Sequence, residues 1–122
     1  MDYDTLIKAL RKILVVASVD NPILPVTSLQ EKEILRCFQG EVDAVMTGIR
    51  FPIGKIEIVL AKAARRDGLG RYHGEQYRIF VMGDNMALYS EKVNSSDYDL
   101  VQLLFEKREK IVDTLLKDFL ES

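Results

Sequence analysis

The chain has 122 residues, of which 48% are hydrophobic and 30% are charged, and its formal net charge is −2. This composition is typical of a globular protein and excludes a disordered chain, and the length suits one domain, residues 1–122, with one core. The single cysteine, Cys37, excludes an internal disulfide, and the longest apolar run, residues 13–17, is far too short to span a membrane. We therefore expect a cytoplasmic protein that does not enter a membrane.

The N-terminal segment predicts an amphipathic helix over residues 2–17. Asp2 or Asp4 can cap its first turn, and the run of residues 18–26, with Pro22 and Pro25, ends it. The apolar positions that fall at helical spacing are Tyr3, Leu6, Ile7, Leu10, Ile13, Leu14 and Ala17.

A second helix is predicted over residues 28–39. Ser28 and Glu31 have the spacing of a capping box, in which each side chain accepts from the other residue's backbone N–H. Gly40 follows at the position where a glycine commonly ends a helix. Ile34, Leu35 and Phe38 form its apolar face.

Residues 41–67 allow two interpretations. Residues 42–46 suit a short helix ending at Gly48 or a strand, and residues 55–60 alternate loosely as a strand does. The next segment, AKAARR, is strongly helix-forming, and Pro52 and Gly68 stand where a helix would start and end. We therefore predict a helix over residues 53–67.

The last third of the chain predicts a β-hairpin and a long helix. Residues 76–82 and 86–90 are rich in strand formers, and the intervening Gly83, Asp84 and Asn85 tolerate the positive φ of a tight turn. Residues 97–121 form the C-terminal helix, whose apolar stripe is wider than one core contact needs. We take this width to favour a homodimer. The stripe comprises Leu100, Val101, Leu104, Phe105, Ile111, Val112, Leu115, Leu116 and Phe119.

Basic residues concentrate between Arg50 and Arg78, where seven lysines and arginines accompany three acids. Such asymmetry can create a basic face on an acidic protein. The seven are Arg50, Lys55, Lys62, Arg65, Arg66, Arg71 and Arg78. His73 is the only histidine, and no catalytic motif, metal-ligand spacing or cofactor motif is present, so we expect no enzyme, no metal and no cofactor.

The order of predicted elements resembles the winged helix-turn-helix proteins, in particular the MarR-like regulators. The matching stretches are LQEKEILRCF, EVDAVMTGI, KIEIVLAKAARRDGL as recognition helix and YRIFVMGDNMALYSEKV as wing. The resemblance implies a mostly helical α+β fold of order α-α-α-α-β-β-α, with a winged-helix core over residues 28–91 between long terminal helices. It also implies that the seven basic residues contact duplex DNA, with Lys55, Lys62 and Arg66 on one helix face in the major groove. The expected dimer interface is Leu6, Leu10, Leu104, Ile111, Leu115 and Phe119.

Two main functional hypotheses follow. The first is a homodimeric transcriptional regulator that binds duplex DNA. The second is a non-enzymatic α+β protein-interaction domain, such as an adaptor, a chaperone or an immunity-type protein. In the second, residues 42–46 and 55–60 are strands of a four-stranded antiparallel sheet that includes the hairpin. A small enzyme using residues 71–75 is a third hypothesis.

Overall fold

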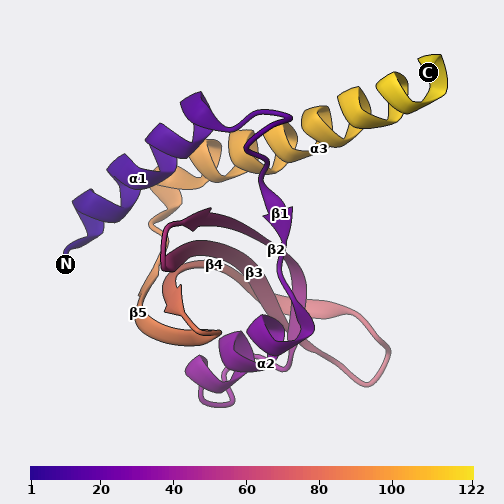
Figure 1. Ribbon diagram of the computed structural model, residues 1–122. Coiled ribbons are helices and arrows are strands. Elements are labelled where there is room, and N and C mark those ends of the chain that lie inside the picture. The colour runs from indigo at the N-terminus through magenta and orange to yellow at the C-terminus, as the bar shows by residue number, and fades with distance from the viewer. The chain divides into compact units, whose positions relative to one another are not determined.

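The computed structural model in Figure 1 describes all 122 residues, which divide into two units. Unit 1 comprises Met1–Leu24 and Asn94–Ser122, and unit 2 comprises Pro25–Val93. Helices make up 42% of the chain and strands 34%. None of the helices combines the length and the apolar character that a membrane crossing requires.

Unit 1 contains helix α1 (Tyr3–Val16), the 3₁₀ turn η1 (Ser95–Asp97) and helix α3 (Tyr98–Glu121). The Tyr3 hydroxyl donates to the Asp97 carboxylate at 2.6 Å and accepts the Asn94 N–H at 2.9 Å, so the first turns of both helices are held together. From there α1 lies along the first half of α3, and the second half of α3 continues beyond it (Figure 1). This follows from their lengths of 14 and 24 residues.

Unit 2 is built on an antiparallel sheet whose five strands are neighbours in chain order. The strands are β1 (Leu24–Pro25), β2 (Ala44–Ile53), β3 (Ile56–Arg66), β4 (Tyr72–Gly83) and β5 (Met86–Lys92). Two residues join β4 to β5, and both have positive φ, 51° at Asp84 and 62° at Asn85. This conformation matches the right-handed twist of the strands that it connects.

Helix α2 (Ser28–Cys37) covers one face of this sheet. Ile34 of α2 and Phe38 at its C-cap pack against alternate residues of β3 and β4. The rings of Phe38 and Phe80 meet edge to face, with 6.4 Å between their centroids. The small side chains of Ala61 and Ala63 let the helix approach the sheet closely. The buried members of the cluster are Ile34, Phe38, Val42, Val59, Ala61, Ala63, Phe80 and Met82.

Two buried polar side chains attach α2 to the sheet. Glu33 is only 6% exposed, accepts the Ala87 N–H of β5 at 2.7 Å, and receives two further hydrogen bonds from Arg36 at 2.5 and 2.8 Å. The Arg36 guanidinium and the Ala87 N–H lower the pKa of Glu33 despite its burial. Gln30 accepts the Thr27 N–H at 3.0 Å and donates to the Glu57 carboxylate. Since β5 is an edge strand, the bond to Glu33 supplies the Ala87 N–H with a partner at the edge of the sheet.

The winged-helix prediction is wrong. Residues 42–46, expected as a short helix, overlap β2, which begins at Ala44. Of residues 53–67, expected as the recognition helix, the segment Ile56–Arg66 forms β3. The chain has three α-helices and a five-stranded sheet, whereas the expected order α-α-α-α-β-β-α contains five helices and one hairpin. The physical reason is burial on both faces of β3, since Ile58 and Leu60 are buried on one face and Val59 and Ala61 on the other. A strand buried on both faces loses its alternating pattern.

Other elements agree with the sequence analysis. Helix α1 begins at Tyr3 with Asp2 as N-cap, the hairpin turn lies at residues 84–85, and α3 spans Tyr98–Glu121. The capping box of α2 is present but one residue earlier than expected, with Thr27 and Gln30 as its members. Both segments that the second hypothesis assigned to strands lie in or overlap strands.

Replacing Glu33 by alanine should destabilise the protein. The change leaves the Ala87 N–H without its acceptor, which costs about 1–3 kcal/mol of unfolding free energy. Urea unfolding followed by circular dichroism measures this loss. Lys32→Ala, at an exposed position of the same helix, is the control and should change stability by under about 0.5 kcal/mol. Equal unfolding midpoints for Glu33→Ala and the wild type would contradict the anchoring role.

Gly48→Ala should also be destabilising. A Cβ at this position of β2 would lie 2.8 Å from Val26 Cγ2, and Val26 is tied to Gly48 by a backbone hydrogen bond of 3.2 Å. Overpacking of this kind costs about 1–3 kcal/mol, and Val26→Ala in the same chain should recover part of it. Gly68→Ala, where a Cβ meets nothing within 4 Å, is the matched control. Urea unfolding gives the free energy of unfolding of Gly48→Ala, Val26→Ala, the double variant and Gly68→Ala. If the losses of the two single variants simply add up in the double variant, the proposed clash is refuted.

Candidate functional site

The second half of α3 carries an uncovered apolar surface, which we call the α3 tail face. Its most exposed member is Leu120, at 78%, and its largest is Phe119, at 75%. Its five residues are Val112, Leu115, Leu116, Phe119 and Leu120, all more than two-fifths exposed. Apolar side chains that are contiguous on one helix and exposed together mark an interaction surface.

The α3 tail face continues a stripe that is buried in the first half of the same helix. Phe119 lies about five helical turns after Val101, so both point to the same side of α3. Val101 is fully buried, as are Leu104 and Ile111, within a few per cent. Burial ends close to the point at which α1, the shorter helix, ends. The tail face therefore lies beyond the part of α3 that α1 covers.

The charges of the tail lie outside this stripe. Asp113 and Lys117 border the tail face, because Asp113 lies about two turns before Leu120 and Lys117 lies one turn after Asp113. Asp118 and Glu121 project from other sides of the helix, and the five residues of the tail face include no ionisable group. The last turn of α3 has no basic residue, and Asp118 and Glu121 there interact unfavourably with the negative end of the helix dipole. The charges at the end of α3 thus contribute little to the stability of this helix end. Packing of its apolar side chains against another surface is the remaining source of stability.

The expected dimer-interface residues separate into two groups. Leu6, Leu10, Leu104 and Ile111 are each at most 5% exposed and belong to the chain's own interior. Leu115 and Phe119 are 45% and 75% exposed and lie on the tail face. Val112, Leu116 and Leu120 complete this face and were not among the expected interface residues. Their helical spacing could have suggested them, but only the length of α1 separates the covered half from the free half.

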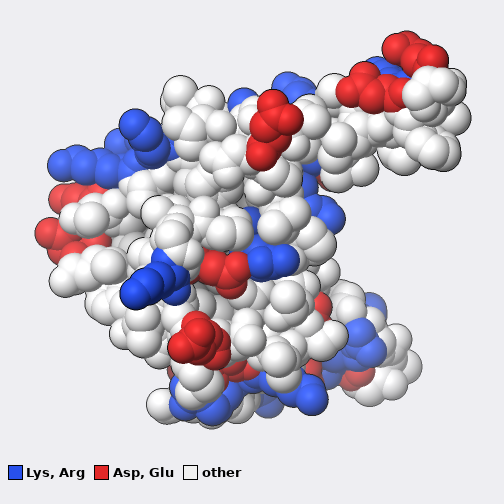
Figure 2. Space-filling model, viewed as in Figure 1, with Lys and Arg blue, Asp and Glu red and all other residues white.

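The expected DNA-binding residues do not share a helix face. Lys55 lies in the turn before β3, whereas Arg65 and Arg66 lie at the far end of β3. Lys62 lies within β3 itself, so Lys55, Lys62 and Arg66 do not form the single helix face that was expected. On the face of the molecule drawn in Figure 2, lysines and arginines are interspersed with acidic residues.

Several of the seven basic residues are paired with carboxylates or other groups of unit 2. Arg50 contacts Glu57 at 2.6 Å, Lys62 contacts Glu75 at 3.1 Å, and Arg71 contacts Asp67 at 3.3 Å. Arg78 donates to the Ser90 hydroxyl at 3.3 Å, and its guanidinium lies 5.0 Å from the Phe38 ring centroid. Arg65 donates to the Gly40 carbonyl. Structural roles thus account for much of the basic composition between residues 50 and 78.

Asp67 organises the loop between β3 and β4. One carboxylate oxygen accepts the N–H groups of Leu69 and Arg71 at 2.8 and 2.9 Å, and the other lies 2.7 Å from a ring nitrogen of His73. The backbone closes the same turn, since the Asp67 N–H donates to the Arg71 carbonyl at 2.8 Å. The hydrogen bond with His73, followed by the one from the Arg71 backbone, lowers the pKa of Asp67.

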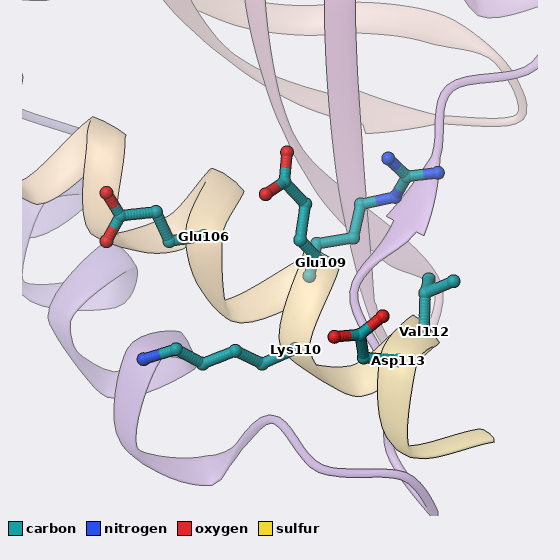
Figure 3. Close-up of a pocket in the computed structure, with 6 residues that line it drawn as sticks. Glu106, Glu109, Lys110, Val112 and Asp113 are labelled. Atoms are coloured by element: carbon teal, nitrogen blue, oxygen red, sulfur yellow. The ribbon is translucent and has the colours of Figure 1, made fainter. Parts of the chain in front are cut away.

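A hollow of about 490 Å³ runs beside α3. Its lining residues come from neighbouring turns of this one helix, and Figure 3 shows that labelled side chains such as Glu109 and Lys110 leave the helix in different directions. They are Glu106, Arg108, Glu109, Lys110, Val112 and Asp113. Groups that diverge from one helix do not converge on a common substrate atom, as a catalytic site requires.

The remaining candidates for chemistry are His73 and Cys37. His73 is an exposed residue at the start of β4, hydrogen-bonded to Asp67. Burial raises the pKa of the Cys37 thiol, which disfavours the reactive thiolate. No group of three or more His, Cys, Asp or Glu side chains is arranged to hold a metal ion.

The fold and its exposed surfaces define an α+β domain with a five-stranded antiparallel sheet and an uncovered C-terminal helix. No family model, curated protein or solved structure matches the chain. Its function is therefore inferred from the geometry of these surfaces.

The Asp67 loop should lose its order in acid. Because the folded-state pKa of Asp67 lies below the ordinary value of 3.8, its stabilising effect is complete above that pH and is lost as the pH falls through the lowered pKa. NMR amide shifts of Leu69 and Arg71 should follow this titration. Asp67→Asn keeps an acceptor oxygen without a titrating group, so these shifts should become independent of acid. An unchanged titration in Asp67→Asn would assign it to another group.

Proposed function

We propose that this protein is a cytoplasmic, non-enzymatic protein-interaction domain that forms a homodimer through the α3 tail face. The observation that carries the proposal is the continuity of one apolar face of α3, buried at Val101 and bare at Phe119. The free thiol of Cys37 agrees with the reducing environment of the cytoplasm.

The exposed area suits association with a partner of similar size. The five side chains of the tail face present on the order of 500 Å² of apolar surface, which is the size of the largest patch on a typical monomer, and such a patch is often functional. Two such faces would together bury on the order of 1,000 Å², the lower limit for a specific protein–protein interface. Only part of the free energy of this apolar burial remains as binding energy, because association costs translational, rotational and side-chain freedom, so we expect a moderate, reversible dimer.

A second copy of the chain is the occupant that the chemistry favours. The tail face contains no charge that would select a partner of opposite sign, and an apolar surface is complementary to itself. Two α3 tails packed side by side would each supply the covering that α1 gives to the first half of the helix. They would also stabilise a helix end that lacks favourable capping charges.

Dimerisation would make the protein bivalent. Each surface of unit 2 would be present twice in one particle, and a target with two matching sites would bind both with increased avidity. This property suits the adaptor or chaperone function of the interaction-domain hypothesis. It does not depend on any contact between the two units.

The proposal predicts that Leu115→Ser together with Phe119→Ser yields a monomer. Light scattering after size exclusion should give twice 13.9 kDa for the wild type at about 100 µM and 13.9 kDa for the variant. Both side chains are exposed within one chain, so the variant should remain folded by circular dichroism. Leu103→Ser is the control, because Leu103 is 48% exposed and lies about two and a half turns before Val112, on the opposite side of α3.

A monomeric wild type at this concentration would overturn the proposal. So would a dimer that survives the Leu115/Phe119 double change but is lost in Leu103→Ser, since another face of α3 would then be the interface. If the wild type is monomeric and the tail face instead binds a different chain, α3 serves a heteromeric contact and self-association is wrong.

A further inference from the structure

The hairpin between β3 and β4 projects as an arm, residues 65–75, which we call the β3–β4 arm. All of its residues are exposed except Asp67, which is half-buried. Strand pairing continues into it, with Arg65 opposite His73 and Arg66 opposite Tyr72, and Figure 1 shows the connecting loop extending away from the sheet. The arm therefore has no apolar core of its own and contributes little to the packing of unit 2.

The arm is nevertheless held in one conformation. Its loop is closed by the hydrogen bonds that Asp67 makes to the backbone of Leu69 and Arg71. Gly70 and Gly74 have φ values of +79° and +65°, which side-chain-bearing residues rarely adopt. A surface element that is both ordered and uncovered loses little entropy on binding, which favours a recognition role.

Cationic groups lie on both faces of this ribbon. Because opposed residues of an antiparallel pair point to the same side, Arg65 and His73 share one face, and Arg66 and Tyr72 share the other. The Arg66 guanidinium donates to the Tyr72 hydroxyl at 2.6 Å and lies 5.1 Å from the ring centroid. Neither guanidinium is paired with a carboxylate, since that of Arg65 donates to the Gly40 carbonyl and that of Arg66 to Tyr72. The backbone N–H of Arg66 donates to the Asp43 carboxylate at 2.8 Å, which holds the base of the arm. Both keep their full charge for an external anion.

The tip of the arm is apolar. Leu69 is 78% exposed and stands between Gly68 and Gly70, so nothing in the loop shields it. Arg71 follows at the base of the tip, where it shares the Asp67 carboxylate with His73. The arm thus combines an apolar point with arginines along both sides.

We propose that the β3–β4 arm binds duplex nucleic acid, with Arg65 and Arg66 on phosphates of opposite groove walls and Leu69 against the base edges. A two-stranded ribbon fits the major groove of DNA, and a groove offers anions to both of its faces. An anionic membrane offers a plane of charge, which a ribbon with cations on two faces meets on one face only. The arrangement of charge therefore favours a groove. The inference is independent of the proposed dimer.

Fluorescence anisotropy of a labelled random-sequence duplex of about 20 base pairs, at about 50 and 150 mM salt, tests the arm. Wild-type protein should bind at the lower salt and weaken steeply at the higher one. Arg65→Ala with Arg66→Ala should lower affinity about tenfold or more and reduce the log–log salt slope by about 2. Lys8→Ala with Arg11→Ala removes the same charge from exposed positions of α1 and should change neither quantity comparably.

Three outcomes would overturn the inference: no binding at low salt, equal losses in the arm and α1 variants, or arm-dependent binding to phosphatidylserine vesicles but not to DNA. The last would assign the arm to a membrane surface instead. Leu69→Ser tests the contact of Leu69 with the base edges separately from the phosphate contacts of the arginines. This variant should weaken binding without changing the salt slope, because it removes no charge. The oligomeric state of every variant is measured alongside, so that a failed dimer proposal is distinguished from a failed arm proposal.

Discussion

The central strand β3 is the constraint on which unit 2 depends. Its backbone pairs with β2 on one side and β4 on the other, and its side chains are buried on both faces. Every N–H and C=O in such a strand needs a partner, and pairing with β2 and β4 supplies these partners on both sides from Glu57 to Ala63. Ala61 and Ala63 are required there by the close approach of Ile34 and Phe38 from α2. The same alanines made the segment resemble a helix in the sequence.

The connection between α2 and the sheet is polar as well as apolar. Glu33 accepts a backbone N–H of β5, and Gln30 donates to a carboxylate of β3, so the two contacts hold the helix against strands on either side of β4. Buried hydrogen bonds of this kind add little net stability when made but are costly when one partner is lost. They fix which way α2 lies on the sheet, since the apolar cluster alone is less directional.

The α3 tail face and the β3–β4 arm, to which we assign binding, arise in the same way. In each, a helix or a strand pair extends beyond the residues that pack against it. The α3 tail face begins near the end of α1, and the β3–β4 arm begins where the apolar residues of β3 give way to Arg65 and Arg66. The two differ in chemistry: the tail face is apolar and uncharged, whereas the arm is cationic with a single apolar tip. They are accordingly assigned to different kinds of partner, a second chain and a polyanion.

Local sequence determined the elements whose signals are local. The Asp2 cap and helical spacing defined α1, the positive-φ residues Asp84 and Asn85 defined the hairpin turn, and the broad stripe of α3 indicated a surface beyond one core contact. Tertiary structure alone decided that residues 56–66 form a strand, because their burial on both faces depends on segments distant in sequence. It also decided which half of the α3 stripe is free and that Arg65 and Arg66 belong to a ribbon rather than a helix. These outcomes depend on long-range packing and strand pairing, which can override the intrinsic helix preference of a short segment.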